Sequence, residues 1–587
     1  MSTTLRHIEQ ARQLLEQVPW FAVLPEAARD ALLAGCVAQP VLGGAVLFFE
    51  GETSDSAYLV LSGCLGAFRR GDEGAQLVGQ IVMGETVGEL GVLTQRPRTA
   101  TVRALRDSEV LRLPAAHLEA VGAQYPQALV GLSRLALRRA TEPRSDRVQD
   151  VAPRTIAVLG QSAGADLIGF ARELSQALSR YGSVRVLDAS QAGQSPAHYL
   201  AIEAESRFVL YVADGQDAVW RSQCRRQADA RLLVARASET VSADAETSVP
   251  READSMPTPE HLVLLHDSEL LLGAGRRWHV QRPEAHLHHV RNSGDVGRLA
   301  RLLCGQSLSL VLSGGGARGF AHLGVIKALR EAGFEIDAVG GTSIGAVIGA
   351  GIAADWSVEE MTEVFRRCFY DTNPLSDYTL PFISLVSGRK ASRLLHEAFG
   401  DRDIEDLPLP YFCVSANLTT GLAAVHRAGT LWQWLRASIA IPGILPPVCL
   451  AGEVHVDGGV INNLPVDVMR RYHHGEVIAV DIGGNYVLKS AIDEVDLPPF
   501  WQLASEWFRK RRRPRLTQIL LRAGMVNSGS AALEARELST LLLTPPLDDI
   551  DLLEWKAFYR AIDRGYQHTL RIVGGRRDAL SEVTSLL

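Results

Sequence analysis

Hydrophobic positions follow two different periods along the first part of the chain. Apolar residues spaced three and four apart over residues 8–18 and in His117–Arg139 predict helices. Between them lie short runs of β-branched and aromatic residues, interrupted by glycine, which predict strands. The predicted strands are Ala45–Phe49, Ala57–Leu61, Leu77–Met83, Ala100–Ala104 and Glu109–Leu113. Residues 1–140 are therefore expected to form a small antiparallel β-roll with flanking helices.

From residue 155 onward, strand and helix patterns alternate, which is typical of an α/β fold. The apolar run Thr155–Leu159 is followed by helical spacing over Leu167–Arg180. The same alternation becomes stronger from Leu308 to about Gly484, and the tail beyond it is predicted to be mostly helical.

Two segments with almost no large apolar side chains divide the chain. Thr141–Arg154 mixes proline with charged and polar residues, and Ser238–Glu260 contains little that could enter a core. We therefore expect a multidomain protein. The expected parts are the β-roll at 1–140, an intervening α/β region at 155–300, an α/β domain at 305–485 and a helical extension packed on that domain at 486–587.

Composition narrows the classes of function. The chain has 60 Lys and Arg against 67 Asp and Glu, a formal net charge of −7, so we expect no nucleic-acid partner. Its seven cysteines lie far apart without paired spacing, which predicts neither a disulfide framework nor a thiolate metal site. The first 25 residues contain no apolar stretch like that of a secretory signal, and the run Ile344–Ala354 is too short to span a bilayer. A cytoplasmic location is the resulting expectation.

A glycine-rich turn, Gly314–Gly319, follows the buried-strand pattern Leu308–Ser313 and leads into helical spacing over Phe320–Ala332. Glycines between a buried strand and a helix N-terminus let backbone N–H groups point at an anion, either a bound phosphate or a transient oxyanion. The turn lacks the Lys-Ser/Thr of a P-loop and the spacing of a dinucleotide site, which disfavours a nucleotide there.

Ser343 stands at the centre of a G-x-S-x-G motif, Gly341–Gly345, between a predicted strand end and a small-residue helix. Glycines two residues before and after the serine permit the sharp turn that exposes its hydroxyl. The motif alone is common by chance, but its strand–turn–helix setting shortly after the glycine-rich turn is not. Ser343 is therefore the candidate nucleophile, and the glycine-rich turn is the candidate site for an oxyanion.

A nucleophilic serine needs a proton acceptor. Asp457 ends the alternating strand Glu453–Asp457 and precedes two glycines, which makes it the best candidate, although Asp-Gly-Gly on its own is more often a turn. Histidine is the usual partner of a serine, but His322, His426 and His455 have no obvious acidic residue to orient them. His322 also falls inside a helical apolar pattern, where a core role is more common than catalysis.

These residues resemble the patatin-like serine lipases, which use a Ser–Asp dyad. The resemblance covers about residues 305–485 and rests on four segments in family order. They are GGGARGFAH at 314–322, GTSIG at 341–345, ASIAIP at 437–442 leading to Pro446-Pro447, and DGG at 457–459. One departure is Leu445, where phenylalanine is common before Pro-Pro, and this touches the shape of the pocket more than the chemistry.

The resemblance implies an α/β patatin-like hydrolase in which Ser343 is the nucleophile and Asp457 the general base. Its oxyanion hole would be formed by Gly314, Gly315 and Gly316, with Arg318 as support. An ester would then be hydrolysed through an acyl-enzyme, with no cofactor needed for catalysis.

A second motif, Gly84–Thr101, lies in the β-rich first region. The carboxylate of Glu89 and, nine residues later, the guanidinium of Arg98 suit a ligand that has both hydroxyls and a phosphate. Taken singly, either charge is better explained by a surface hairpin. Together the spacing resembles the phosphate-binding cassette of cyclic-nucleotide-binding domains. The resemblance implies that Glu89 holds the ribose 2′-hydroxyl and Arg98 the cyclic phosphate of cAMP or cGMP. The cassette would be lined by Gly88, Leu90, Thr99 and Ala100.

Together, the cassette and the patatin-like unit resemble the bacterial relatives of neuropathy target esterase. Trp278–Arg291 is similar to the segment before the catalytic unit in that family. The resemblance implies a serine esterase that hydrolyses acyl esters of phospholipids or lysophospholipids and is regulated by a cyclic nucleotide. His286, His288 and His289 have no acidic or cysteine ligand nearby, so no metal is expected.

Two rival functions remain. A catalytically inert, cyclic-nucleotide-responsive sensor or scaffold is disfavoured by the presence of Ser343, Asp457 and the full glycine-rich turn. A cAMP-dependent transcription factor would need a helix-turn-helix after residue 140, where a linker and an α/β region follow instead.

A lipid ester has to be taken from an interface, and one segment of the tail suits contact with it. Four aromatic residues, Phe500, Trp501, Trp507 and Phe508, precede the consecutive cations Arg509–Arg513, a combination that favours anionic headgroups. A helix end with a solvated basic turn explains the segment equally well. Peripheral contact with the inner face of the membrane is thus a further expectation for location.

Overall fold

A computed structural model of the chain describes residues 12, 19–22, 24–71, 74–141, 152–194, 196–215, 217–240, 258–483 and 535–584. The chain forms two compact units, the first comprising residues 1–265, 284–286 and 292–304, and the second 266–283, 287–291 and 305–587. No helix within the described ranges is both long and apolar enough to cross a bilayer. The aromatic and basic segment at 500–513 lies outside the described residues, so its membrane contact stays a prediction.

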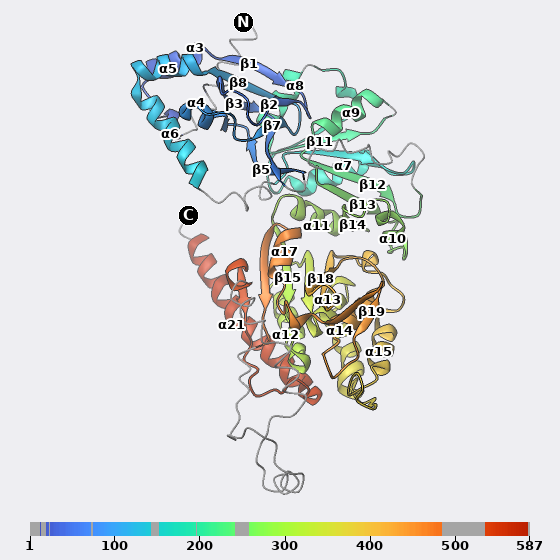
Figure 1. The fold of residues 1–587 in the computed structure, drawn as a ribbon. Coiled ribbons are helices and arrows are strands. Elements are labelled where there is room, and N and C mark those ends of the chain that lie inside the picture. Colours follow the sequence, from blue (N-terminus) through green and yellow to red (C-terminus); the bar gives the residue numbers. More distant parts are fainter. Residues whose placement is uncertain are drawn as a thin grey trace, which may run out of the picture. The chain divides into compact units, whose positions relative to one another are not determined.

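The first unit begins with a roll of two antiparallel sheets, each of four strands (Figure 1). Their orders are β1-β8-β3-β6 and β2-β7-β4-β5. Residues of β3 alternate between two faces, as in any strand. Leu59 and Leu61 enter the core beneath the helices, whereas Tyr58 and Val60 enter the core between the sheets. The predicted antiparallel β-roll is confirmed. Its strands are β1 (Val37–Val41), β2 (Val46–Phe48), β3 (Ser56–Ser62), β4 (Cys64–Gly71), β5 (Gly74–Val82), β6 (Thr86–Val87), β7 (Thr101–Ala104) and β8 (Ser108–Pro114).

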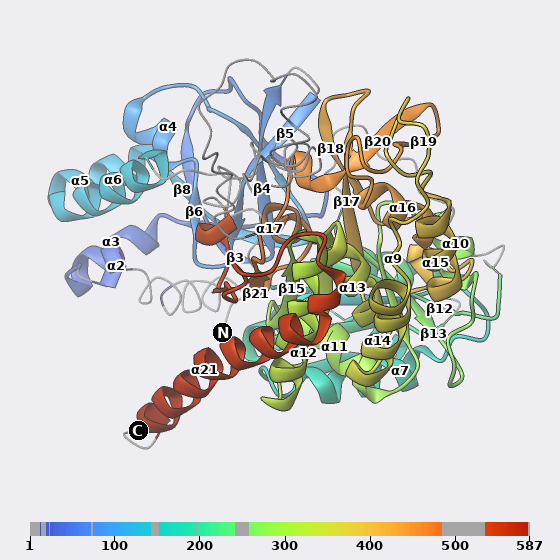
Figure 2. The same cartoon turned by 90° about the horizontal axis from the view of Figure 1, so that it is seen from below.

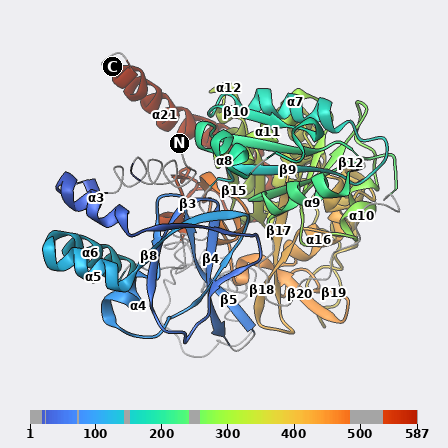
Figure 3. The same cartoon turned by 90° about the horizontal axis from the view of Figure 1, so that it is seen from above.

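Helices flank this roll on one side, as Figure 3 shows. The pair α5 and α6 packs closely because Gly122 has no side chain, and a Cβ there would lie 2.2 Å from Leu129 Cδ1. The helical pattern predicted in His117–Arg139 corresponds to the two helices α5 and α6. The helix predicted over residues 8–18 lies, apart from residue 12, outside the described residues. The flanking helices are α2 (Pro19–Ala22), α3 (Glu26–Ala34), α5 (Ala115–Gln124) and α6 (Pro126–Thr141), and a further short helix, α4 (Glu89–Thr94), lies within the cassette.

An α/β layer follows the roll, built on a sheet of order β10-β11-β9-β12-β13-β14. The pairs from β10 to β13 are parallel. All six residues of β11 are buried, as expected of a parallel strand covered on both faces. The elements are β9 (Thr155–Gly160), α7 (Leu167–Leu178), β10 (Val184–Leu187), α8 (Pro196–Glu205), β11 (Phe208–Ala213), α9 (Ala218–Arg226), β12 (Ala230–Arg236), β13 (Glu260–Leu265), β14 (His286–Val290) and α11 (Ser293–Leu303).

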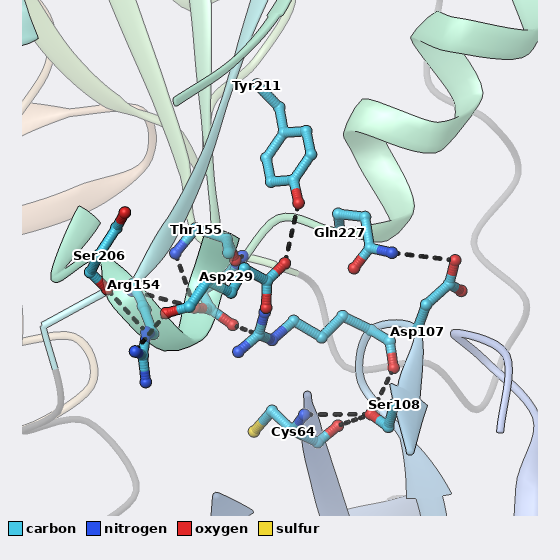
Figure 4. A network of polar contacts seen from close by, with 11 residues as sticks. Cys64, Asp107, Ser108, Arg154, Thr155, Ser206, Tyr211, Gln227 and Asp229 are labelled. Atoms are coloured by element: carbon cyan, nitrogen blue, oxygen red, sulfur yellow. Dashed lines mark hydrogen bonds and ion pairs between the residues drawn. The ribbon is translucent and has the colours of Figure 1, made fainter. Parts of the chain in front are cut away.

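A buried ionic network joins the roll to this α/β layer within the first unit (Figure 4). Arg106, between β7 and β8, donates through Nη1 to Glu203 Oε2 at 2.8 Å, and its Nε lies 2.9 Å from Asp229 Oδ1. Tyr211 also donates to Glu203, at 2.9 Å. Burial alone would lower the pKa of Arg106, but the two carboxylates outweigh it and hold that pKa above its ordinary value. The network therefore keeps a charged guanidinium where the two layers meet.

The second unit is built on a sheet of order β19-β20-β17-β16-β15-β21-β22, with β18 paired to β17. Strands β22, β21, β15, β16 and β17 run parallel, whereas β18, β19 and β20 add antiparallel pairs beside β17. The strands are β15 (Ser307–Leu312), β16 (Ala338–Thr342), β17 (Tyr411–Asn417), β18 (Leu422–His426), β19 (Val448–Leu450), β20 (Glu453–Asp457), β21 (Gly475–Val480) and β22 (Leu541–Leu543). The helices include α10 (Ala274–His279), α12 (Ala321–Glu331), α13 (Ile344–Ala353), α14 (Val358–Phe365), α15 (Arg389–Phe399), α16 (Leu431–Ser438) and α17 (Val466–Tyr472). The carboxyl ends of the parallel strands share one edge, where the glycine-rich turn and Ser343 follow β15 and β16.

The tail packs on this sheet through both a strand and a helix. Strand β22 extends the sheet beside β21, an element that the prediction of a mostly helical tail omits. The long helix α21 (Phe558–Thr584) lies along α12 (Figure 2). A Cβ at Gly324 would lie 1.9 Å from the Ile562 carbonyl oxygen, and one at Gly565 would lie 2.1 Å from that of Ala321. These two glycines let the helix backbones touch.

Candidate active site

Ser343 occupies a sharp turn between β16 and α13. Its φ of 55° and ψ of −128° are rare for a residue with a side chain, and such strain persists only where the surroundings enforce it. A Cβ at Gly341 would lie 2.7 Å from the carbonyl carbon of Gly345, and one at Gly345 would lie 2.4 Å from the Leu312 carbonyl oxygen. The two motif glycines therefore allow β16 and α13 to meet β15 at this turn, which fixes the direction of the Ser343 side chain.

Asp457, at the end of β20, lies opposite this serine. Ser343 Oγ donates a hydrogen bond of 2.6 Å to Asp457 Oδ2, and the Gly459 amide donates one of 2.8 Å to Asp457 Oδ1. Burial raises the pKa of Asp457 to about 6, although both hydrogen bonds act to lower it. A carboxylate with this pKa is a stronger base than an ordinary aspartate and is still mostly ionised at neutral pH. The geometry thus pairs a strained hydroxyl with an acceptor able to take its proton.

Ser438 holds the backbone of the candidate nucleophile. Its Oγ accepts a 2.9 Å hydrogen bond from the Ser343 amide and donates one of 2.7 Å to the Val414 carbonyl oxygen. The side chain is fully buried at the end of α16. Ser438 lies in the ASIAIP segment noted in the sequence, but nothing in that segment shows that this hydroxyl reaches a turn 95 residues earlier.

The glycine-rich turn passes beside Ser343. A Cβ at Gly314 would lie 2.9 Å from Ser343 Cβ, and one at Gly316, which has a φ of 55°, would lie 2.1 Å from the Leu552 carbonyl oxygen. The Gly314 amide donates to the Asn463 carbonyl oxygen at 3.3 Å. Among the described residues, no acceptor takes the amide protons of Gly315 and Gly316. These two amides, rather than that of Gly314, are the better donors for an oxyanion.

Arg318 ties the glycine-rich turn to two other segments by hydrogen bonds. Its Nε donates to the Ile550 carbonyl oxygen at 2.8 Å and its Nη1 to that of Gly483 at 3.1 Å. The side chain is buried and ties the turn to the tail and to the segment after β21. These contacts agree with the supporting role implied for Arg318.

Asn463 is a second residue that the sequence motifs do not single out. Its Nδ2 donates to the Gly314 carbonyl oxygen at 3.3 Å. Its Oδ1 has no hydrogen-bond partner among the described residues, and the residue is buried. The position that a Cβ of Gly314 would take lies 2.7 Å from this oxygen and 2.9 Å from Ser343 Cβ. An acceptor is therefore held next to the candidate nucleophile.

An apolar cavity lies beside Ser343. Its wall includes Ser343 and Gly316 and is otherwise almost entirely hydrophobic. Such a cavity suits a hydrocarbon chain attached to the group that Ser343 would attack. Its apolar lining is Ile344, Val347, Phe365, Cys368, Phe369, Pro374, Leu375, Ala391, Leu394, Leu395, Ala398, Phe399, Ile439, Ile441, Leu445 and Trp555.

The histidines weighed as partners of Ser343 have other contacts. His322 is buried, with its Nε2 2.9 Å from the Ser313 carbonyl oxygen, and burial lowers its pKa to about 4. His426 and His455 both contact Ser415 Oγ, at 2.7 Å and 3.0 Å. These contacts favour structural roles for all three.

The cassette residues come together in the first unit. Gly88, with a φ of 82°, precedes α4, and Glu89 begins that helix in a buried position. Arg98 is also buried and donates to the carbonyl oxygens of Gly88 at 3.0 Å and Ser56 at 2.7 Å. Its guanidinium carbon lies 4.1 Å from the centre of the Phe48 ring. A cation and a carboxylate are thus held at one turn, as a phosphate and ribose site requires, although this cation contacts the protein's own carbonyls.

Three segments of the chain match known families. Residues 310–470 match the patatin-like phospholipase family, residues 39–125 the cyclic nucleotide-binding domain, and residues 152–296 the P-loop like domain of the Neuropathy Target Esterase family. The second unit thus carries a patatin-like domain. The first unit carries a cyclic nucleotide-binding domain, and both domains lie where the motifs predict them.

The chain is similar to longer proteins over most of its own length. It is 32% identical over 616 residues to Patatin-like phospholipase domain-containing protein 6 of Homo sapiens, covering 91% of this chain and 44% of the human protein. It is 30% identical over 580 residues to Lysophospholipase NTE1 of Cryptococcus neoformans, covering 84% of this chain and 35% of the fungal protein. The chain therefore spans less than half the length of these relatives. Among solved structures, the regulatory domain of Toxoplasma gondii PKA with cAMP is 25% identical, covering 20% of this chain and 44% of that one with a TM-score of 0.19.

Proposed function

We propose that the second unit is a serine esterase that hydrolyses acyl esters of phospholipids or lysophospholipids. The observation that carries the proposal is the 2.6 Å hydrogen bond from Ser343 Oγ to Asp457, beside an apolar cavity that Ser343 lines. The likeness to a protein named as a lysophospholipase agrees with this substrate class.

In the proposed reaction, Asp457 Oδ2 takes the Ser343 proton while Oγ attacks the ester carbonyl carbon. The carbonyl oxygen gains negative charge and accepts hydrogen bonds from the amides of Gly315 and Gly316. As the C–O bond breaks, the proton on Asp457 passes to the leaving alcohol, and the acyl group stays on Ser343. Water then gives a proton to Asp457 and attacks the carbonyl carbon of the acyl-enzyme. As the bond to Ser343 breaks, Asp457 returns this proton to Oγ, which releases the fatty acid and restores both residues. No cofactor is needed for these steps.

A fluorophosphonate probe and a soluble ester such as p-nitrophenyl butyrate test this dyad together with micellar lysophosphatidylcholine. We expect Ser343→Ala to abolish labelling and hydrolysis of both substrates. Ser179→Ala, at an exposed serine of the first unit, is the matched control and should leave both unchanged. Labelling and hydrolysis that survive Ser343→Ala would refute the role of Ser343. An unaltered protein that neither labels nor hydrolyses either substrate would favour the inert sensor or scaffold.

We propose further that the cassette binds cAMP or cGMP as a regulatory ligand, with Arg98 on the phosphate and Glu89 on the ribose. The remaining contacts would come from Gly88, Leu90, Thr99 and Ala100. The phosphate has to replace the carbonyl groups of Gly88 and Ser56 around the Arg98 guanidinium. Calorimetric titration with each nucleotide tests this, and binding that is unchanged in Arg98→Ala would exclude the cassette.

We also propose that the chain acts on the cytoplasmic side of a membrane surface. All seven cysteines are free, which fits a reducing compartment. Its substrates are amphiphiles, so they are presented by a membrane or a micelle.

A further inference from the structure

A loop beside the cavity exposes an unusual group of apolar side chains. It connects the π-helical segment η3 (Arg366–Asp371) to α15. Tyr378, Leu380, Phe382 and Ile383 are 78%, 73%, 89% and 72% exposed, and Pro381 is exposed between them. Single exposed apolar residues need no explanation, but such a cluster marks a contact surface.

The base of the loop is firmly held, so these side chains project from an ordered support. Tyr378 forms an antiparallel bridge with Val386, and the Thr379 amide donates to the Leu385 carbonyl oxygen at 3.1 Å. The Asp377 carboxylate accepts from Ser387 Oγ at 2.6 Å and from the Lys390 amide at 3.1 Å. The loop is a small hairpin that is held by hydrogen bonds at its base and exposes apolar side chains toward its tip.

The same base packs against the cavity wall. The amides of Leu385 and Val386 donate to the carbonyl oxygens of Gly443 and Ile444 at 2.9 Å and 3.0 Å. Buried Val386 packs in one cluster with Ala391 and Leu445, both of which line the cavity. The base of the hairpin is therefore anchored on residues that line the cavity beside Ser343.

Cations border the loop. Arg389 is exposed at the first residue of α15, and Lys390 follows it, with its Nζ donating to Ser376 Oγ at 2.7 Å. The only acid between residues 376 and 390, Asp377, is engaged in the hydrogen bonds at the base. Apolar and aromatic side chains bordered by cations are the composition of a segment that enters the headgroup region of a lipid surface.

We propose that residues 378–383 insert into the lipid surface that holds the substrate and bring the cavity to it. The proposal rests on the proposed function, because a lipid surface is the expected source of the ester. A second copy of this chain would also cover an apolar tip. The lipid surface is favoured because the hairpin is anchored on residues that line the cavity and because the bordering charges suit phosphate headgroups.

The test compares the unaltered protein with the triple variant Leu380→Ser/Phe382→Ser/Ile383→Ser, whose side chains do not line the cavity. Leu418→Ser/Leu422→Ser, at exposed leucines beside the β17–β18 turn, is the matched control. Co-sedimentation with vesicles of phosphatidylcholine and phosphatidylglycerol, at four to one, measures binding. Hydrolysis of p-nitrophenyl butyrate and of micellar lysophosphatidylcholine is measured on the same samples, with light scattering for the oligomeric state.

We expect the triple variant to lose at least tenfold in vesicle partition and in micelle hydrolysis, and to keep soluble-ester hydrolysis within twofold. Phe382→Trp should bind vesicles as well as the unaltered protein, and the control should match it throughout. Vesicle partition that is unchanged in the triple variant would overturn the proposal. A dimer that the triple variant loses without losing vesicle binding would overturn it in favour of a second copy.

Failure of the proposed function gives a different result. Soluble-ester hydrolysis would then survive Ser343→Ala. The loss of vesicle partition in the triple variant would still show whether the loop binds lipid.

Discussion

Replacing Asp457 by asparagine is expected to abolish catalysis and stabilise the fold. In the fold the pKa of Asp457 is about 6, against an ordinary value of 3.8, because the carboxylate is buried. A gap of about two pKa units corresponds to about 3 kcal/mol. Since the folded pKa is raised, the contribution of Asp457 to stability is full below pH 3.8 and is lost as the pH rises through about 6. The ionised side chain therefore weakens the fold at neutral pH.

Asparagine avoids this cost. Its Oδ1 can still accept from the Gly459 amide, but it has no charge to bury and cannot take the Ser343 proton. We expect Asp457→Asn to raise the free energy of unfolding at pH 8 by up to about 3 kcal/mol, and by about half as much at pH 5. Soluble-ester hydrolysis should fall by at least about 10²-fold.

Urea unfolding followed by circular dichroism at pH 8, 6.5 and 5 measures the difference in free energy of unfolding between Asp457→Asn and the unaltered protein. Asp563→Asn, at an exposed aspartate of α21, is the control and should give no pH-dependent difference. The reasoning would be refuted if Asp457→Asn were less stable than the unaltered protein at pH 8. It would also be refuted if the difference in free energy of unfolding between the two proteins were the same at pH 8 and pH 5.

Three further predictions follow from the same contacts. For the unaltered enzyme, kcat/KM on the soluble ester should be flat above pH 7 and fall about tenfold per unit well below pH 6, because Asp457 must be ionised to act as a base; a profile that stays flat to pH 4.5 would contradict this. Ser438→Ala should lower kcat about tenfold to 10²-fold with KM nearly unchanged, because the Ser343 amide loses its acceptor; steady-state kinetics that show only a raised KM would count against a positioning role. Arg106→Met should destabilise the first unit by about 3–5 kcal/mol, because the carboxylates of Glu203 and Asp229 lose their buried cation. Thermal unfolding measures this, and a variant in which both carboxylates are also replaced by leucine should recover the melting temperature. Equal melting temperatures for the unaltered protein and Arg106→Met would exclude the effect.

The features that the sequence predicts well are those whose signal is local. The strained turn at Ser343 has its glycines two residues away on either side, and Asp457 carries its two glycines directly after it. The β-roll follows from short strands with alternating faces, and the α/β layers follow from buried apolar runs. In each case the residues that determine the element lie within a few positions of one another.

Other features depend on residues that meet only in the folded chain. Ser438 reaches the Ser343 amide across 95 residues, and Asn463 reaches Gly314 across 149. The sequence also assigns the Gly314 amide to the oxyanion hole, but this amide donates to the Asn463 backbone instead. Strand β22 is only three residues long and is stabilised by pairing with β21, so it is too short for an alternating sequence pattern to predict it.

The most direct test of the central claim is the capture of an acyl group on Ser343. The enzyme is mixed with lysophosphatidylcholine, quenched in acid within milliseconds and analysed by mass spectrometry of the peptide that contains Ser343. We expect a transient increase in mass equal to one acyl group on that peptide. The increase should be absent in Ser343→Ala and should not form within the first turnover time in Asp457→Asn. An acyl group found on another residue, or hydrolysis with no adduct on Ser343 at any quench time, would contradict the role of Ser343.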